Sequence, residues 1–330
     1  MKVAINGFGR IGKQFFLACM EQNVPWEFVI NDISSLDTIV YSLKYDSVHP
    51  SPKEEVSRDL KNLHFGKKKI RVYQEKDLEN LPWKKEKVDL VVECTGLFTK
   101  KSDAMKHIKT GAKKVLISAP AEDSDCTLIQ GVNAKALKKT HTIISAGSCT
   151  TNCVSPMVKI LHDFFKVKSC FFTTTHAYTS TQKLIDSFDK KDFRRGRSAS
   201  QNIIPTTSGA AQSVVESIPE LKGKLDGFAL RVPVVDGSIS TVVAVIEKKT
   251  NKEEINRIFK NQAQKDYKDI LGYAEDPIVS SDIIHDSHSC IFDPSLTSVT
   301  ENLISISGWY DNEWGYSNRL VDVAKILLAK

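Results

Sequence analysis

The chain has 330 residues, of which 41% are hydrophobic and 26% are charged, and its formal net charge is +6. These fractions are those of an ordinary globular protein and exclude a disordered chain. The length predicts two domains, each large enough to bury its own core. No apolar run approaches the length of a membrane span, and the N-terminus enters a strand without signal-peptide features, so we expect a cytoplasmic protein.

The seven cysteines are scattered and odd in number, which is not the pattern of a disulfide framework, and the absence of Cys-x-x-Cys pairs predicts no metal site. The lysines fall in scattered doublets without a basic tail, which disfavours a dedicated nucleic-acid module. An anionic small-molecule substrate explains the positive charge equally well.

The first elements form a strand–turn–helix–strand pattern. Lys2–Asn6 is an apolar strand, a G-x-G-x-x-G turn follows at once, and Gln14–Glu21 has helical spacing. A second apolar strand, Phe28–Ile30, is followed by Asp32, twenty residues beyond Gly12. This context is typical of a dinucleotide-binding unit.

Each glycine of the turn has a physical role in such a site. Gly7 allows the tight turn, Gly9 lets the backbone approach a pyrophosphate, and Gly12 lets helix and strand pack closely. Asp32 would accept hydrogen bonds from the ribose hydroxyls and repel a 2′-phosphate, which favours NAD without excluding NADP. The alternative is an ordinary tight βα turn.

Strands and helices continue to alternate as far as Gly147. The predicted strands are Ile70–Tyr73, Val88–Val92, Val115–Ser118 and Thr142–Ser145, and a surface helix is predicted over Lys100–Thr110. The alternation predicts an α/β Rossmann-type domain, residues 1–147, with a doubly wound parallel sheet. Thr95 and Ser118 follow strands, at the carboxyl ends where such sheets bind ligands.

A cysteine between hydroxyl residues, Cys149, follows this domain directly. It precedes Val154–Phe165, which has helical spacing, although Pro156 predicts a late start or a kink. At a helix N-terminus the macrodipole and free N–H groups favour a thiolate, so we expect a lowered pKa and a nucleophile. The alternative is an inert, buried cysteine.

The second half has longer runs of β type that alternate in polarity. They are Cys170–Thr175, Gly227–Val232, Ser238–Ile246 and Leu303–Trp309. This alternation predicts an α+β domain with a largely antiparallel sheet. His176 ends the first of these strands, and an imidazole beside a thiol could take its proton; a structural histidine is the alternative.

Candidate anion-binding groups surround these two residues in the sequence. Three arginines lie at positions 194–197 within a polar loop, Tyr178–Asn202, and Thr206–Gly209 precedes a predicted helix, Ala210–Ile218. Arg231 ends a strand, where it could hold a phosphate with two hydrogen bonds. The arginine cluster could instead be an exposed basic loop or a subunit interface.

Four motifs together resemble the phosphorylating glyceraldehyde-3-phosphate dehydrogenase family, and the likeness covers essentially the whole chain. They are Asn6-Gly7-Phe8-Gly9-Arg10-Ile11-Gly12, Ser148-Cys149-Thr150-Thr151-Asn152-Cys153, His176-Ala177-Tyr178-Thr179 and Trp309-Tyr310-Asp311-Asn312-Glu313-Trp314-Gly315-Tyr316-Ser317. The resemblance implies a glycolytic oxidoreductase. In it Cys149 attacks an aldehyde with His176 as base, hydride passes to NAD, and phosphate cleaves a cysteine thioester to 1,3-bisphosphoglycerate.

The resemblance also implies the other site residues. The substrate phosphate would be held by Thr179, Thr181 and Arg231. The attacking phosphate would be held by Ser148, Thr150, Ser208 and Gly209, with Arg195 nearby. The cofactor would be contacted by the three glycines and by Arg10, Ile11, Asp32, Lys76, Thr95, Ser118 and Asn312.

On the same ground we expect a catalytic domain at 148–316, a C-terminal helix at 317–329 packed on the nucleotide domain, and a homotetramer. In that assembly the Tyr178–Asn202 loop would lie against a neighbour's cofactor site. The alternatives are a dehydrogenase for erythrose 4-phosphate or another phospho-aldehyde, an amino-acid semialdehyde dehydrogenase, and a scaffold or RNA-binding role.

Overall fold

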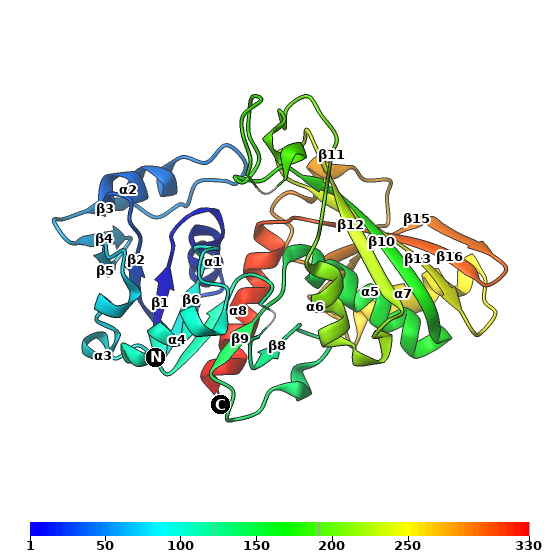
Figure 1. Cartoon of the computed structure of the whole chain (residues 1–330), viewed down its shortest axis with the longest axis horizontal. Helices are drawn as coiled ribbons and strands as arrows, with labels where there is room; N and C mark the ends of the chain where they lie inside the picture. Colours follow the sequence, from blue (N-terminus) through cyan, green and yellow to red (C-terminus); the bar gives the residue numbers. More distant parts are fainter. Residues whose placement is uncertain (122, 191, 330) are drawn as a thin grey trace. The chain divides into compact units, whose positions relative to one another are not determined.

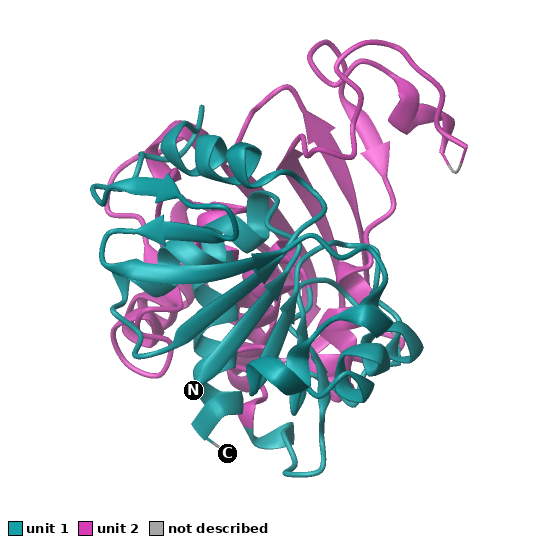
Figure 2. Cartoon of the chain, turned by 90° about the vertical axis from the view of Figure 1, so that its left-hand side faces the viewer, with its two compact units in different colours: residues 1–128, 135–147, 317–330 teal, residues 129–134, 148–316 magenta. Residues whose placement is uncertain are grey.

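A computed structural model describes residues 1–121, 123–190 and 192–329. The chain divides into two compact units, and each is described here by itself (Figure 2). Unit 1 comprises residues 1–128, 135–147 and 317–330, and unit 2 comprises residues 129–134 and 148–316. Within the described residues, every helix is too short or too polar to span a bilayer.

Unit 1 is built on a nine-stranded sheet. Its strands are β1 (Lys2–Asn6), β2 (Glu27–Asn31), β3 (Val56–Arg58), β4 (Asn62–Phe65), β5 (Lys68–Tyr73), β6 (Leu90–Glu93), β7 (Lys114–Ile117), β8 (Cys126–Thr127) and β9 (Ile143–Ser145). The spatial order is β3-β4-β5-β2-β1-β6-β7-β9-β8, and only the pairs β3–β4 and β4–β5 are antiparallel. The order reverses around β1, so the carboxyl ends of β1, β2 and β6 form the crevice where open α/β sheets bind ligands.

Helices and short turns connect these strands. They are α1 (Arg10–Glu21), α2 (Leu36–Lys44), a 3₁₀ turn (Leu78–Asn80), α3 (Trp83–Glu86), α4 (Lys101–Lys109) and a second 3₁₀ turn (Ala134–Ala136). The central strands are buried on both faces, which explains why β1 and β6 are apolar runs without alternation.

The last helix, α8 (Trp314–Ala329), belongs to unit 1 from Ser317 onward. Gln22 donates to Asn318 Oδ1 at 2.6 Å and accepts from Lys325 at 2.6 Å, while Lys114 donates to the Leu327 carbonyl at 2.7 Å. These bonds join the two ends of the chain within one unit.

Unit 2 contains a seven-stranded sheet. Its strands are β10 (Val167–Ala177), β11 (Ile204–Thr206), β12 (Leu225–Val232), β13 (Ser238–Ile246), β14 (Leu271–Tyr273), β15 (Cys290–Thr300) and β16 (Leu303–Tyr310). The order is β11-β12-β10-β13-β16-β15-β14, with β10–β12 and β14–β15 parallel and the other pairs antiparallel.

Three helices pack on one face of this sheet: α5 (Cys149–Phe165), α6 (Ala210–Ser217) and α7 (Lys252–Gln264) (Figure 1). The remaining turns of unit 2 are 3₁₀ segments at Phe193–Gly196, Pro219–Leu221 and Ser280–Ile283. Burial alternates along β13, and Val242 and Ala244 join the core formed with α5. Each buried valine or leucine side chain of α5 stabilises this packing by about 2 kcal/mol.

The predicted fold class is confirmed: a mostly parallel Rossmann-like sheet and a second, largely antiparallel sheet. Most predicted strands lie within two or three residues of the observed ones. Of the two alternatives predicted from Pro156, a late helix start is excluded, because α5 begins at Cys149 and contains Pro156. The strands β3, β4, β8, β11, β14 and β15 were not predicted: the first five have only two to four residues each, and β15 is interrupted by Pro294 and a shift in register between Asp293 and Ser298.

Candidate functional site

Unit 1 contains a cavity of about 790 Å³ at the carboxyl ends of its central strands. It is lined by Asn6, Gly7, Gly9, Asn31, Asp32, Ile33, Ser34, Glu75, Lys76, Asp77, Leu78, Cys94, Thr95, Leu97 and Phe98. The structure therefore brings together five of the predicted cofactor residues: Gly7, Gly9, Asp32, Lys76 and Thr95.

The glycine turn has the geometry expected of a nucleotide site. Gly7 has φ +89°, and a side chain there would meet the Thr95 backbone at 2.7 Å. A Cβ on Gly12 would lie 2.0 Å from the Gly7 carbonyl oxygen, so only glycine allows α1 to pack here. A Cβ on Gly9 would meet nothing within 4 Å. The packing of the protein therefore does not require glycine at position 9. The open space beside Gly9 fits a pyrophosphate that approaches the backbone.

Asp32 is held by the backbone around the cavity. One carboxylate oxygen accepts the Phe8 N–H at 2.6 Å, and the other accepts the Ser34 N–H at 2.7 Å. Each carboxylate oxygen can accept a further bond, so the fixed carboxylate suits a ribose diol.

The cavity lining, taken over the described residues, does not include four of the predicted cofactor residues: Arg10, Ile11, Gly12 and Ser118. The Arg10 guanidinium pairs with Asp46 at 2.6 Å, and the Ser118 hydroxyl donates to the Glu93 carbonyl at 2.9 Å. Burial works against ionisation of Asp46, but hydrogen bonds from Lys13, His49 and Val48 outweigh it and lower the pKa of that carboxyl.

A buried carboxylate that sequence reasoning missed organises the floor of this cavity. Glu93 accepts from Asn6 Nδ2 at 2.6 Å and from the Thr95 N–H at 2.8 Å, and it also binds the Thr95 hydroxyl. Behind it, His107 Nε2 lies 3.1 Å from Glu93, and Trp83 donates to His107 Nδ1 at 3.0 Å. The bond from Trp83 makes Nδ1 an acceptor, so Nε2 carries the hydrogen that faces Glu93. The only sequence signal was a charged residue directly after the predicted apolar strand Val88–Val92.

In unit 2, Cys149 is the first residue of α5. Ser148 caps the helix, because its hydroxyl accepts the Thr151 N–H at 3.1 Å while Thr151 Oγ1 accepts the Ser148 N–H at 3.1 Å. This capping box fixes the chain beside Cys149 without using its thiol. Thr150 Oγ1 lies 2.9 Å from the Tyr310 hydroxyl, which ties the first turn to β16.

The fold brings His176 to Cys149. Cys149 Sγ lies 3.3 Å from His176 Nε2, within hydrogen-bond distance for sulfur. His176 and Arg231 are register partners on the parallel strands β10 and β12, so their side chains emerge at the same edge of the sheet. Arg231 Nη1 lies 2.5 Å from His176 Nδ1 and 3.1 Å from the Ala177 carbonyl oxygen.

Burial dominates the electrostatics of this pair. It raises the pKa of the Cys149 thiol to about 11, although Arg231 and hydrogen bonds from Thr150 act in the opposite direction. Burial, and then the charge of Arg231, lowers the pKa of His176 to about 3. The expectation of a lowered thiol pKa is therefore wrong for the isolated group, because loss of hydration exceeds the effect of the helix terminus.

The predicted phosphate residues lie on several segments of unit 2. Thr179 and Thr181 follow β10, with their hydroxyls 2.9 Å apart. Burial lowers the pKa of the Arg231 guanidinium, and the charge of the nearby Arg195 lowers it further. Ser208 and Gly209 precede α6, where the Ser208 hydroxyl accepts the Ala210 N–H at 3.2 Å.

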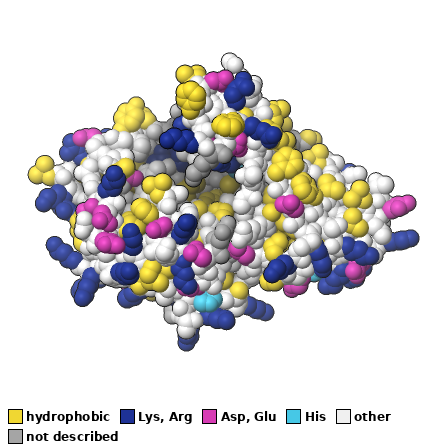
Figure 3. Space-filling view, in the orientation of Figure 1, with side chains coloured by type: hydrophobic (Ala, Val, Ile, Leu, Met, Phe, Trp, Pro, Cys, Tyr) yellow, Lys and Arg dark blue, Asp and Glu magenta, His cyan; other side chains and the backbone are white. Residues whose placement is uncertain are grey.

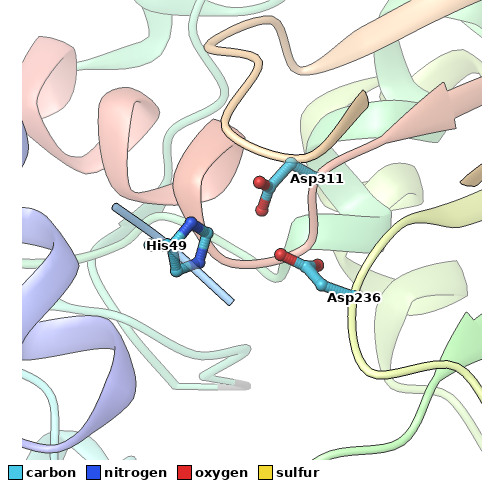
Figure 4. Close-up of side chains that lie close together, drawn as sticks. All are labelled: His49, Asp236 and Asp311. Atoms are coloured by element: carbon cyan, nitrogen blue, oxygen red, sulfur yellow. The ribbon is translucent and has the colours of Figure 1, made fainter. Parts of the chain in front are cut away.

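Asn312 is held by groups that were not predicted. Its Oδ1 accepts the Ser238 hydroxyl at 2.6 Å, and its N–H donates to Asp236 at 3.3 Å. The Nδ2 group is then oriented as a donor. The carboxylates of Asp236 and Asp311 point toward one another (Figure 4), and both residues are buried. Burial, followed by the charges of Asp311 and Glu313, raises the pKa of Asp236 to about 8.

A dinucleotide-type cavity in one unit and a cysteine–histidine pair in the other indicate a class of protein: a dehydrogenase that uses a nicotinamide cofactor. Two family models match the chain. The model described as "Glyceraldehyde 3-phosphate dehydrogenase, NAD binding domain" matches residues 1–101, and "Glyceraldehyde 3-phosphate dehydrogenase, C-terminal domain" matches residues 148–312.

Curated relatives agree over the full length. The chain is 50% identical to a glyceraldehyde-3-phosphate dehydrogenase of Streptomyces coelicolor, with 98% of this chain and 97% of the relative covered. It is 46% identical to the enzyme of that name from Geobacillus stearothermophilus, with 100% and 99% covered. The chain belongs to the glyceraldehyde-3-phosphate dehydrogenase family, and it is an NAD-dependent oxidoreductase.

Substitutions at the glycine turn separate folding from cofactor binding. We expect Gly12→Ala to lower the free energy of unfolding by about 2–4 kcal/mol, because its Cβ meets a backbone carbonyl. Gly9→Ala adds the same methyl group to open space and keeps an ordinary φ of −72°, so its stability should equal that of the wild type. Its Kd for NAD should rise about tenfold or more, a cost of about 1.4 kcal/mol. Thermal unfolding and calorimetric titration measure the two effects. An unchanged Kd in Gly9→Ala would contradict the assignment of the space beside Gly9 to the cofactor pyrophosphate.

Asp236 gives a pH dependence of stability. An unfolded Asp titrates near 3.9, whereas the folded pKa is about 8, so between these values the folded state holds a proton that the unfolded state has released. Stability contributed by this group is complete below about pH 4 and is lost as the pH rises through the folded pKa. We expect the unfolding temperature to fall between about pH 5 and about pH 9. Asp236→Asn, which cannot ionise, should show a smaller fall; identical slopes would refute the assignment.

Proposed function

We propose that this protein catalyses the phosphorylating oxidation of glyceraldehyde 3-phosphate to 1,3-bisphosphoglycerate in glycolysis, with NAD as the hydride acceptor. The observation that carries the proposal is the 3.3 Å contact between Cys149 Sγ and His176 Nε2 beside Arg231. A nucleophile, a base and a cation at one sheet edge are what an anionic aldehyde requires.

The pKa values of the pair define the first step. A buried thiolate is costly, so the proton leaves Cys149 as the sulfur attacks the aldehyde carbon, and His176 Nε2 takes it. The product is a hemithioacetal on Cys149, and the imidazolium and the Cys149 backbone N–H stabilise its oxyanion. Loss of hydride leaves a thioester on the same sulfur, which inorganic phosphate then cleaves to the acyl phosphate.

Two sets of residues would hold the two phosphate groups. Thr179, Thr181 and Arg231 are proposed for the substrate phosphate; Ser148, Thr150, Ser208 and Gly209, with Arg195 nearby, are proposed for the attacking phosphate. In support, the hydroxyls of Thr179 and Thr181 lie 2.9 Å apart. The guanidinium groups of Arg195 and Arg231 lie near one another. Like charges at close range are stabilised by an anion between them.

Bound NAD supplies a hydride acceptor. Gly7, Gly9, Asp32, Lys76 and Thr95 would hold it through the cavity of unit 1, and Arg10, Ile11, Gly12 and Ser118 remain proposed contacts around it. Asn312 would orient the carboxamide, because Ser238 occupies its oxygen and leaves Nδ2 to donate.

We also propose a homotetramer located in the cytoplasm. The loop Tyr178–Asn202 exposes large apolar side chains, with Phe188 99% and Phe193 90% exposed. Figure 2 shows loops of unit 2 that project beyond its sheet, and hydrophobic side chains reach the surface in the view of Figure 3. Phe171 and Val243 add apolar surface on the open sheet face. Apolar surface of this kind is typical of subunit contacts. Seven free cysteines suit a reducing compartment.

The test follows NADH formation with glyceraldehyde 3-phosphate, with and without phosphate or arsenate. We expect turnover to require one of these anions and Cys149→Ser to abolish it, since a serine hydroxyl titrates far above neutral pH. Cys153→Ser, one turn along α5, is the matched control and should retain activity.

NAD binding should persist in Cys149→Ser, which separates loss of chemistry from loss of folding. Equal rates without either anion would exclude the acyl-phosphate product, and faster turnover of erythrose 4-phosphate would reassign the substrate. Light scattering checks the tetramer.

A further inference from the structure

Two buried serines lie on the same face of β13 and differ in their hydrogen bonds. Ser238 and Ser240 are both 0% exposed, and residues two apart on a strand share a face. The Ser238 hydroxyl bonds to Ala177 and to Asn312, and the Ser240 hydroxyl bonds to neither. The chain therefore offers a matched pair of hydroxyls with which the contribution of Ser238 can be isolated.

The Ser238 hydroxyl accepts one hydrogen and donates its own. It accepts the Ala177 N–H at 3.1 Å, just beyond the last register pair of β10 and β13, Thr175 and Ile239. It lies 2.6 Å from Asn312 Oδ1, to which it donates. Because a backbone N–H can only donate, the hydroxyl hydrogen remains available for Asn312.

This hydrogen determines which end of the Asn312 amide faces Ser238. If the amide were reversed, Nδ2 would donate to Ser238 Oγ, and the hydroxyl hydrogen would lose its acceptor at a position closed to water. The observed orientation satisfies both groups. Ser238 therefore sets the orientation of the amide.

The backbone beside these two residues is fixed as well. Asp236 Oδ1 accepts the Gly237 N–H at 2.8 Å and the Asn312 N–H at 3.3 Å. Gly237 has φ +86°, and a Cβ there would lie 2.2 Å from the Ser280 carbonyl oxygen, so this turn into β13 requires glycine. The amide of Asn312 is thus held from its backbone and from its Oδ1.

The other end of the amide, Nδ2, is left for a ligand. Asn312 is only 5% exposed, and its Nδ2 has no acceptor among the residues that the structure describes. It is not one of the enclosed polar atoms that lack a partner, so it remains accessible. A carboxamide oxygen is an acceptor of the kind that this group requires.

We propose that Ser238 is a positioning residue for the nicotinamide end of the cofactor. By holding Asn312 Oδ1, Ser238 ensures that an N–H donor faces the carboxamide oxygen. With the amide free to reverse, an oxygen could take that place, and two acceptors would face each other. The inference rests on the proposed function, which assigns the carboxamide to Asn312.

ADP-ribose, which lacks the nicotinamide ring, separates positioning from a structural role. We expect Ser238→Ala to raise the Kd for NAD about fivefold or more, because one oriented hydrogen bond is lost, and to leave the Kd for ADP-ribose unchanged. Ser240→Ala removes an equally buried hydroxyl from the same face and should change neither Kd. Calorimetric titration measures both ligands, and thermal unfolding checks that each variant is folded.

Two further substitutions keep the space at position 238 filled. Ser238→Thr retains the hydroxyl, so its ratio of the Kd for NAD to the Kd for ADP-ribose should be that of the wild type. Ser238→Cys offers only a weak donor and should raise this ratio. The test therefore does not depend on the folding of Ser238→Ala.

Removal of Asn312 tests the route by which Ser238 acts. In an Asn312→Ala background, Ser238→Ala should not change the ratio further, because no amide remains to be oriented. An unchanged ratio in both Ser238→Ala and Ser238→Cys would overturn the proposal. So would an equal change in Ser240→Ala, or a full further change in the Asn312→Ala background.

Failure of the proposed function would be seen separately, as absence of phosphate-dependent NADH formation from glyceraldehyde 3-phosphate by the wild type. The ratio of the two Kd values does not depend on turnover. It therefore reports on Ser238 whichever aldehyde the protein oxidises.

Discussion

The contact between a helix terminus and a strand end at Cys149 and His176 is the constraint on which the site depends. The side chains of Ser148 and Thr151 cap the N-terminus of α5 with two reciprocal hydrogen bonds, so the Cys149 thiol is not needed for capping. The imidazole stands on β10, whose neighbours β12 and β13 fix it from both sides. Because Cys149 lies on α5 and His176 on β10, their separation does not depend on a loop.

Burial decides how this pair works. It disfavours both the thiolate and the imidazolium, and in the proposed reaction the two charges form together as the sulfur attacks the aldehyde. The same low-polarity surroundings strengthen the influence of Arg231 on the ring.

Unit 1 uses buried polarity for a different purpose. Glu93 and His107 lie beneath the cavity and hold Asn6 and Thr95, which line it. A buried carboxylate is tolerated because each oxygen accepts hydrogen bonds from fixed donors. The network keeps the cavity wall in place, whereas the glycine turn leaves room for the cofactor.

Local sequence determined the glycine turn, the acid at Asp32, the position of Cys149 at a helix start and the two types of sheet, because turn chemistry, periodicity and helix capping act over a few neighbouring residues. It could not show that Arg10 pairs with Asp46, that Glu93 supports the cavity or that burial raises the pKa of Cys149. Those properties depend on groups distant in the chain and on exclusion of water, which exist only once the chain has folded. The contact between Arg231 and His176 is of this second kind, since 55 positions separate the two residues and only the parallel register of β10 and β12 makes them neighbours.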